Sequence, residues 1–125
     1  MEVKGIVWVG TATDRYDETV AFFRDVLGLG VFHASPNLTV LRTGSGEWVE
    51  VFGPGHEHFP EFDRGPVVEF LVDDVPAARA ELEARGVAFL HEDHSWNGYT
   101  WAHFRGPDGN IYGITSGPYR GGEAA

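Results

Sequence analysis

Two glutamates and the aromatic residues beside them are the groups in this sequence best suited to bind a ligand or move a proton. Glu50 and Glu69 each lie in a short apolar stretch typical of a strand. Side chains alternate between the faces of a strand, so Trp48 and Phe52 share the face of Glu50. If these faces line one groove, a carboxylate between aromatic walls attracts a cation, and its raised pKa suits a general base.

A strand over 100–105 adds a second set of candidates, in one of two registers. Either Trp101 and His103 face the groove, or Ala102 and Phe104 do. The candidate ligand-binding residues are Trp8, Trp48, Glu50, Phe52, Glu69, Trp96, Trp101 and His103. Among them Glu50 is also the candidate catalytic residue.

Structural explanations compete with each of these assignments. The tryptophans, Trp8 included, can fill the groove or a dimer interface instead of binding a ligand. Glu50 can pair with Arg42, and Glu69 can lie exposed at a strand edge. His103 can be a hydrogen-bonded strand histidine with no further role.

Length and charge narrow the classes of function. The chain has 125 residues, enough for one domain spanning 1–125, and its formal net charge of −10 comes from 9 basic and 19 acidic residues. Such a charge disfavours nucleic-acid binding and favours a cationic partner. There is no cysteine, no run of about 18 apolar residues and no signal-peptide pattern, so we expect a cytoplasmic protein without membrane contact.

An internal repeat organises these residues. An apolar run followed by a helical pattern begins at Val7 and recurs at Val67, each time followed by room for three short strands. We therefore predict two βαβββ modules, at about 3–55 and 66–117, with a linker at 53–65 and a loose tail at 118–125.

The repeat also predicts the individual elements. The helices are expected over 14–28 and 74–86, the first with a buried stripe of Tyr16, Val20, Phe23 and Leu27. Asp74 is the expected N-cap of the second helix. The short strands are expected at 30–35, 38–43 and 47–52 in module one, and at 88–92, 100–105 and 110–115 in module two.

Three segments resemble the vicinal oxygen chelate superfamily, which includes glyoxalases, bleomycin-resistance proteins and extradiol dioxygenases. They are Glu18–Leu29 (ETVAFFRDVLGL), Phe70–Val75 (FLVDDV) and Phe104–Asn110 (FRGPDGN), within a similarity that runs from about residue 3 to 115. The resemblance implies an α+β fold in which two tandem βαβββ modules form a cupped mixed sheet with helices on its outer face. It also implies a homodimer.

The resemblance places metal ligands at four strand positions of the family. In this sequence those positions hold Val7 or Trp8, then Glu50, Val67 and Gly113, of which only Glu50 matches a ligand. One carboxylate does not hold a divalent cation tightly, so we predict no metal cofactor. A relocated site built from the histidines, such as His91, His94 and His103, remains open as the less favoured alternative.

These observations leave three hypotheses. The first is a metal-free small-molecule binding protein, resembling the bleomycin-resistance branch, that holds an aromatic or cationic compound in the cup. The second is a glyoxalase-like lyase or isomerase, or a dioxygenase-type enzyme, with or without a metal, in which Glu50 is the general base. The third is a scaffold whose cup is filled by its own side chains.

Overall fold

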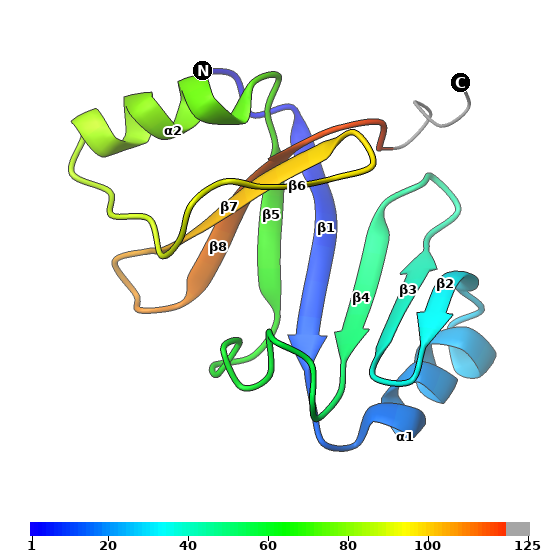
Figure 1. Ribbon diagram of the computed structural model, residues 1–125. Helices are drawn as coiled ribbons and strands as arrows, with labels where there is room; N and C mark the ends of the chain where they lie inside the picture. The colour runs from blue at the N-terminus through cyan, green and yellow to red at the C-terminus, as the bar shows by residue number, and fades with distance from the viewer. Residues whose placement is uncertain (120–125) are drawn as a thin grey trace.

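One curled eight-stranded sheet forms the centre of the molecule (Figure 1). The computed structural model describes residues 1–119. The strands are β1 (Gly5–Ala12), β2 (Gly30–Ser35), β3 (Leu38–Arg42), β4 (Trp48–Phe52), β5 (Val67–Leu71), β6 (His94–Trp96), β7 (Tyr99–Arg105) and β8 (Ile111–Ser116). The helical segments are α1 (Tyr16–Ala21), a π-helical turn η1 (Phe22–Val26) and α2 (Val75–Ala84).

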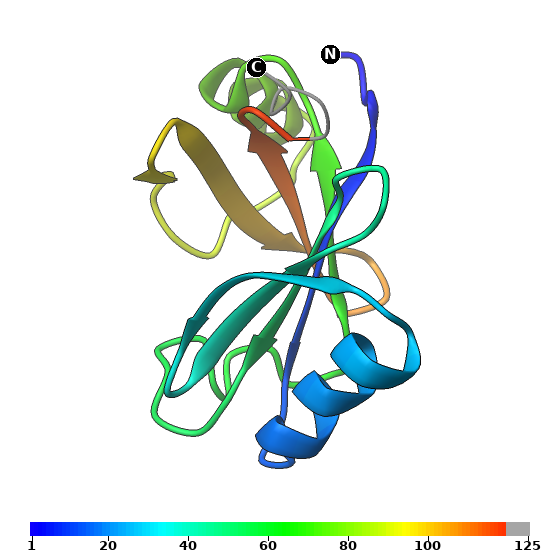
Figure 2. The same cartoon turned by 90° about the vertical axis from the view of Figure 1, so that its right-hand side faces the viewer.

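The sheet consists of two halves with the same connectivity. Its strand order is β2-β3-β4-β1-β5-β8-β7-β6, with β1 parallel to β4 and β5 parallel to β8. The halves meet where β1 pairs antiparallel with β5. Figures 1 and 2 show α1 and α2 at opposite ends of the molecule. The predicted fold class, two βαβββ modules in a cupped mixed sheet with outer helices, is confirmed.

The predicted buried stripe of the first helix is not followed at the C-terminal end of that helix. Val20 is buried, and Tyr16 and Phe23 pack with it against the outer side of β3 and β4. Leu27, however, is 55% exposed, so its predicted burial is wrong. The π-helical turn η1 has more residues per turn than an α-helix and rotates Leu27 off the stripe, and Leu29 packs against the cluster instead.

The second helix agrees with its sequence signals. The Asp74 side chain accepts a hydrogen bond from the Ala77 backbone N–H at 3.0 Å, so the predicted N-cap is present. The helix ends before Gly86, whose φ of +93° suits a residue without a side chain. Its buried residues Val75 and Ala78 pack on the outer face of β7 and β8.

The strand predicted at 88–92 is wrong. That segment is a loop with a single bridge from Phe89 to Phe104, and the short strand β6 comes later. Arg79 of α2 explains the loop, because its guanidinium donates to the His91 carbonyl at 2.9 Å and to Asp93 at 2.7 Å. Those two contacts hold the chain away from a continuous sheet ladder.

The linker and the start of the tail both contribute buried side chains. Phe62 of the linker is buried in the same cluster as the cup-side aromatic rings, and His58 is also buried. Tyr119 is buried as well, and its hydroxyl hydrogen-bonds to Thr115 at 2.8 Å. The rest of the predicted tail, 120–125, lies outside the described residues.

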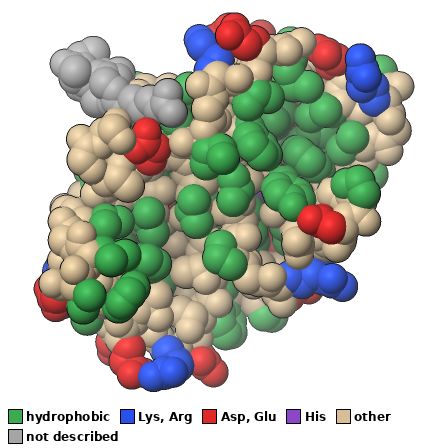
Figure 3. Space-filling model, turned by 180° about the vertical axis from the view of Figure 1, so that it is seen from behind, with side chains coloured by type: hydrophobic (Ala, Val, Ile, Leu, Met, Phe, Trp, Pro, Cys, Tyr) green, Lys and Arg blue, Asp and Glu red, His purple; other side chains and the backbone are tan. Residues whose placement is uncertain are grey.

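Some apolar side chains remain at the surface. Figure 3, which views the molecule from behind Figure 1, shows hydrophobic side chains gathered over the segment of α1 and η1, at lower left. Phe22, Val26 and Leu27 are among the exposed large hydrophobic residues. The expected homodimer stays a prediction.

Within residues 1–119, no helix is long and apolar enough to cross a membrane.

Candidate functional site

A cavity of about 600 Å³ occupies the concave side of the sheet, which we call the cup. Among residues 1–119, no residue of α1, η1 or α2 lines it. All eight candidate residues from the sequence do: Trp8, Trp48, Glu50, Phe52, Glu69, Trp96, Trp101 and His103. The cup is therefore not filled by its own side chains, as a pure scaffold requires. A role of these residues in binding stays a prediction.

Sequence reasoning missed about half of the lining. The missed residues include Phe32, Leu38, Val40, His56, His58, Phe62 and Tyr119. Alternation along β3 was the one available signal, since Leu38 and Val40 face the same side. The linker and Tyr119 reach the cup through long-range packing, for which the sequence carries no local signal.

The structure resolves the open register of the hairpin formed by β7 and β8. Trp101 and His103 face the cup, and His103 pairs across the ladder with Gly113. Ala102 and Phe104 pack on the other side against α2. The first of the two predicted registers is thus the one observed.

Glu50 is a partly buried carboxylate without a cationic partner among the described residues. Trp8 donates its indole N–H to Glu50 at 2.6 Å. Burial raises the pKa of Glu50 to about 7, while this hydrogen bond opposes the rise and the nearby Glu69 adds to it. Arg42, considered as a partner for Glu50, instead stacks its guanidinium on Phe32 at 3.8 Å. The cup thus contains a carboxyl group that titrates near neutral pH.

Glu69 and His103 form a buried pair at the floor of the cup. Glu69 is 3% exposed, so the strand-edge alternative does not hold, and its Oε2 lies 2.6 Å from Nε2 of His103. Burial raises the pKa of Glu69 well above its ordinary value and lowers the pKa of His103 to about 4. Nδ1 of His103 lies 2.9 Å from Nε2 of His91, whose Nδ1 lies 2.7 Å from the Glu92 carbonyl.

Two glycines make room for these side chains. A Cβ on Gly113 would lie 2.8 Å from both the Glu69 side chain and the His103 ring. A Cβ on Gly10 would overlap the Trp8 ring. The absence of a side chain at these positions is therefore a condition for the observed placement of Glu69, His103 and Trp8.

The four strand positions at which the resemblance places metal ligands do not fit a metal ion. They hold Val7 or Trp8, then Glu50, Val67 and Gly113, and only the carboxylate of Glu50 is a donor. The Trp8 ring already directs its N–H at that carboxylate. A tightly bound ion needs two or three protein donors, so these four positions do not hold a metal ion tightly.

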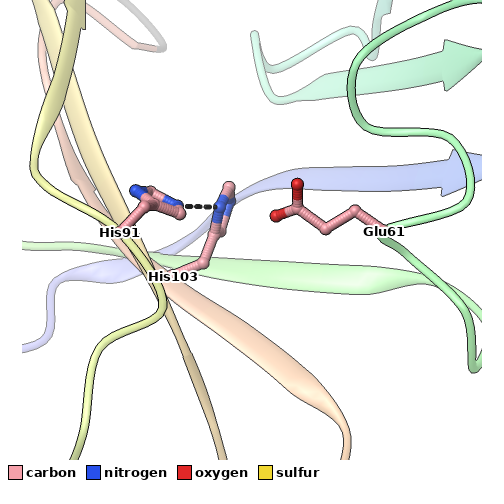
Figure 4. A group of neighbouring side chains, drawn as sticks. All are labelled: Glu61, His91 and His103. Carbon is pink, nitrogen blue, oxygen red and sulfur yellow. Dashed lines mark hydrogen bonds between the residues drawn. The ribbon is translucent and has the colours of Figure 1, made fainter.

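A different group of residues has the composition of a metal site. Glu61, His91 and His103 each place one ligand atom within 4.8 Å of the others (Figure 4). The expected absence of a metal cofactor is therefore not confirmed. His91 and His103 were among the histidines predicted from the sequence as an alternative, relocated site, whereas Glu61 of the linker was missed.

A family profile matches most of this chain, and several solved structures share its fold. The profile of the Glyoxalase/Bleomycin resistance protein/Dioxygenase superfamily matches residues 5–112. Among curated proteins, no sequence matches this chain. Methylmalonyl-CoA epimerase from Mycobacterium tuberculosis has a similar structure, with a TM-score of 0.73 and 22% identity over 98% of this chain and 93% of its own.

Two further solved structures are similar at the same level. A methylmalonyl-CoA epimerase from Streptomyces coelicolor gives a TM-score of 0.72 with 21% identity, over 93% of this chain and 96% of its own. The Mn(II)-bound glyoxalase from Novosphingobium aromaticivorans gives 0.72 with 23% identity over 91% of this chain. The present chain spans 39% of that glyoxalase. At these identities the likeness extends to the fold alone.

Proposed function

Because the chain belongs to the Glyoxalase/Bleomycin resistance protein/Dioxygenase superfamily, we propose that it is a small-molecule binding protein whose cup holds a positively charged aromatic compound. In this proposal, no metal ion occupies the four strand positions, and the side chains of the cup hold the ligand. The observation that carries this proposal is Glu50, a carboxylate in an aromatic cavity with no cationic partner among residues 1–119.

The walls of the cup support an aromatic ligand. The ring centroid of Trp48 lies 4.7 Å from that of Tyr99 and 5.2 Å from that of Phe32. Trp101 also lines the cavity. Flat aromatic walls bind rings well and attract cations through their quadrupoles. The indole N–H of Trp48 is buried and has no hydrogen-bond partner among the described residues, which leaves one donor beside the cavity unsatisfied.

Electrostatics favours a cation over a neutral compound. A cation beside Glu50 stabilises the ionised carboxylate and lowers its pKa below the value of about 7 in the empty cup. The overall charge of −10 also raises the local concentration of cations around the molecule. Both effects depend on the charge of the ligand, whereas the aromatic walls select its shape.

Charge can be tested with two probes of the same shape. Benzyltrimethylammonium and its uncharged isostere neopentylbenzene are titrated at pH 8 against the intrinsic fluorescence, since all four tryptophans line the cavity. The proposal predicts tighter binding of the cation, by 10-fold or more, and loss of that preference in Glu50→Gln. The control Glu18→Gln removes the same charge from the exposed surface of α1. Equal affinity for the two probes, or a preference unchanged in Glu50→Gln, contradicts the proposal.

A second candidate function is proton abstraction next to a carbonyl, with Glu50 as general base. The observation that favours it is the pKa of about 7, which suits a base at neutral pH. Two structural relatives are methylmalonyl-CoA epimerases. If the chain catalyses such a step, methylmalonyl-CoA exchanges its α-hydrogen for deuterium in D₂O, as followed by proton NMR, and Glu50→Gln abolishes the exchange. No exchange above the uncatalysed rate removes this candidate for that substrate.

A further inference from the structure

We infer that Glu61, His91 and His103 bind a divalent transition-metal ion, at a place separate from the four strand positions of the superfamily. Figure 4 shows the three side chains converging, with the Glu61 carboxylate directed toward the His103 ring. The inference is independent of the proposed function, since the ligand of the cup is assigned to Glu50 and the aromatic walls.

The spacing of the donor atoms fits one ion. One ligand atom from each residue lies within 4.8 Å of the other two. Nε2 of His91 and Nδ1 of His103 are 2.9 Å apart. Two imidazole nitrogens that bind one ion at about 2.0–2.1 Å lie roughly 3 Å from each other, so this pair needs little movement.

The other ring nitrogens have the partners that orient metal-binding histidines. Nδ1 of His91 donates to the Glu92 carbonyl at 2.7 Å, because a carbonyl oxygen only accepts. In a neutral His91 ring, Nε2 then carries a lone pair and acts as an acceptor. Nδ1 of His103 shares a hydrogen bond with that nitrogen at 2.9 Å, and Nε2 of His103 hydrogen-bonds to Glu69 at 2.6 Å. A metal ion would replace the proton between the two rings, with His103 then carrying its proton on Nε2 and donating it to Glu69. A carbonyl and a carboxylate behind the ligands are the usual second-shell partners.

The location explains why the four strand positions can lack donors. His103 lies on β7, the strand next to β8, and pairs in register with Gly113 of β8. A side chain at Gly113 would collide with the His103 ring, so a ligand at the strand position of β8 and the imidazole of His103 exclude each other. Glu61 comes from the linker and His91 from the loop before β6. The superfamily scaffold thus supplies donors from a neighbouring strand and two connecting segments.

The donor set selects the class of ion. Two imidazole nitrogens with one carboxylate oxygen suit zinc, cobalt, nickel or ferrous iron, whereas magnesium and calcium require mostly oxygen ligands. The negative charge of the chain favours any divalent cation, so only the donor chemistry separates these groups.

Metal content and spectroscopy test the inference without any assay of activity. The full chain is freed of metal with a chelator, dialysed against Zn²⁺ and analysed for bound metal, with Mg²⁺ as the comparison ion. We expect one Zn²⁺ per chain, no retained Mg²⁺, and visible d–d absorption when Co²⁺ replaces zinc. His91→Gln and Glu61→Gln are each expected to weaken Zn²⁺ binding by 10-fold or more.

Matched variants separate this site from scattered surface histidines and acids. His33→Gln removes an exposed histidine of β2, and Glu57→Gln removes an exposed carboxylate of the same linker that holds Glu61. Both controls should bind Zn²⁺ as the wild type does, and circular dichroism checks that every variant is folded. Absence of Zn²⁺ binding in the wild type, or full affinity in His91→Gln or Glu61→Gln, overturns the inference. Binding of the ammonium probe at Glu50 is measured separately, so the two proposals fail independently.

Discussion

Glu50 is held in the cup at a cost to the stability of the folded chain. Its carboxylate loses water without gaining a cation, and the hydrogen bond from Trp8 compensates only in part. Groups in this situation are common at functional sites, where an interaction with a ligand replaces the missing partner. Two predictions at the residue scale follow from this one carboxyl group.

Replacing Glu50 by glutamine should stabilise the protein at alkaline pH. The folded-state pKa is raised from 4.5 to about 7, so the stability linked to the bound proton is complete below pH 4.5 and is lost as the pH rises through 7. At about 1.4 kcal/mol per pKa unit, the loss approaches about 3 kcal/mol by pH 8. We expect Glu50→Gln to unfold at higher denaturant concentration than the wild type at pH 8, by about 1–3 kcal/mol, with a much smaller difference at pH 5. Equal stability at both pH values would show that Glu50 is not desolvated.

Removing the indole donor should shift the titration of Glu50. Trp8→Phe keeps an aromatic ring in the cup and deletes the N–H that stabilises the carboxylate, so the pKa of Glu50 should rise further. The shift is measured by NMR of side-chain-labelled glutamate. Trp96→Phe is the control, because Trp96 is half exposed on β6 and makes no hydrogen bond to Glu50. An unchanged pKa in Trp8→Phe would contradict the assigned role of the indole.

At the scale of elements, the glycine on β8 determines what the floor of the cup can hold. The space that a side chain at Gly113 would occupy is used by Glu69 from β5 and His103 from β7. The same packing leaves no room for a donor side chain at this position of β8, where the resemblance to the superfamily places a metal ligand.

Gly113→Ala should therefore be markedly destabilising. Its methyl group would lie 2.8 Å from both buried neighbours and 3.1 Å from the Ala102 carbonyl, so the strands must shift. We expect a loss of about 1–3 kcal/mol in the free energy of unfolding, typical of overpacking in a core. Gly44→Ala is the matched control, since its added methyl group meets nothing within 4 Å. A Gly113→Ala protein as stable as Gly44→Ala would refute the packing argument.

The elements that the sequence predicted well are those whose signals are local. Alternation along β4 and β5 placed Glu50 and Glu69 on the cup side, and the cap at Asp74 located the start of α2. The errors arose where a distant contact decides the outcome. Arg79 holds the segment that resembled a strand at 88–92 in a loop, and the π-helical turn η1 changes the phase of the first helix.

At the scale of the whole molecule, the repeat determined where the site lies, and long-range packing determined its composition. The duplicated modules curl one sheet around a cup, which the resemblance to the superfamily implied. The linker then brings Phe62, His58 and Glu61 to that cup from a segment that was expected only to connect the modules. Such contributions depend on the path of a loop, which composition alone does not determine.

The pH dependence of ligand affinity tests the central claim, a cation held by ionised Glu50, most directly. The dissociation constant of benzyltrimethylammonium is measured by tryptophan fluorescence from pH 5.5 to 8.5, for the wild type and for Glu50→Gln. Since binding requires the carboxylate, affinity should be constant above about pH 7 and should fall toward 10-fold per pH unit below it. Glu50→Gln should bind weakly at every pH. An affinity of the wild type that does not change across this range, or that matches Glu50→Gln, would contradict the account.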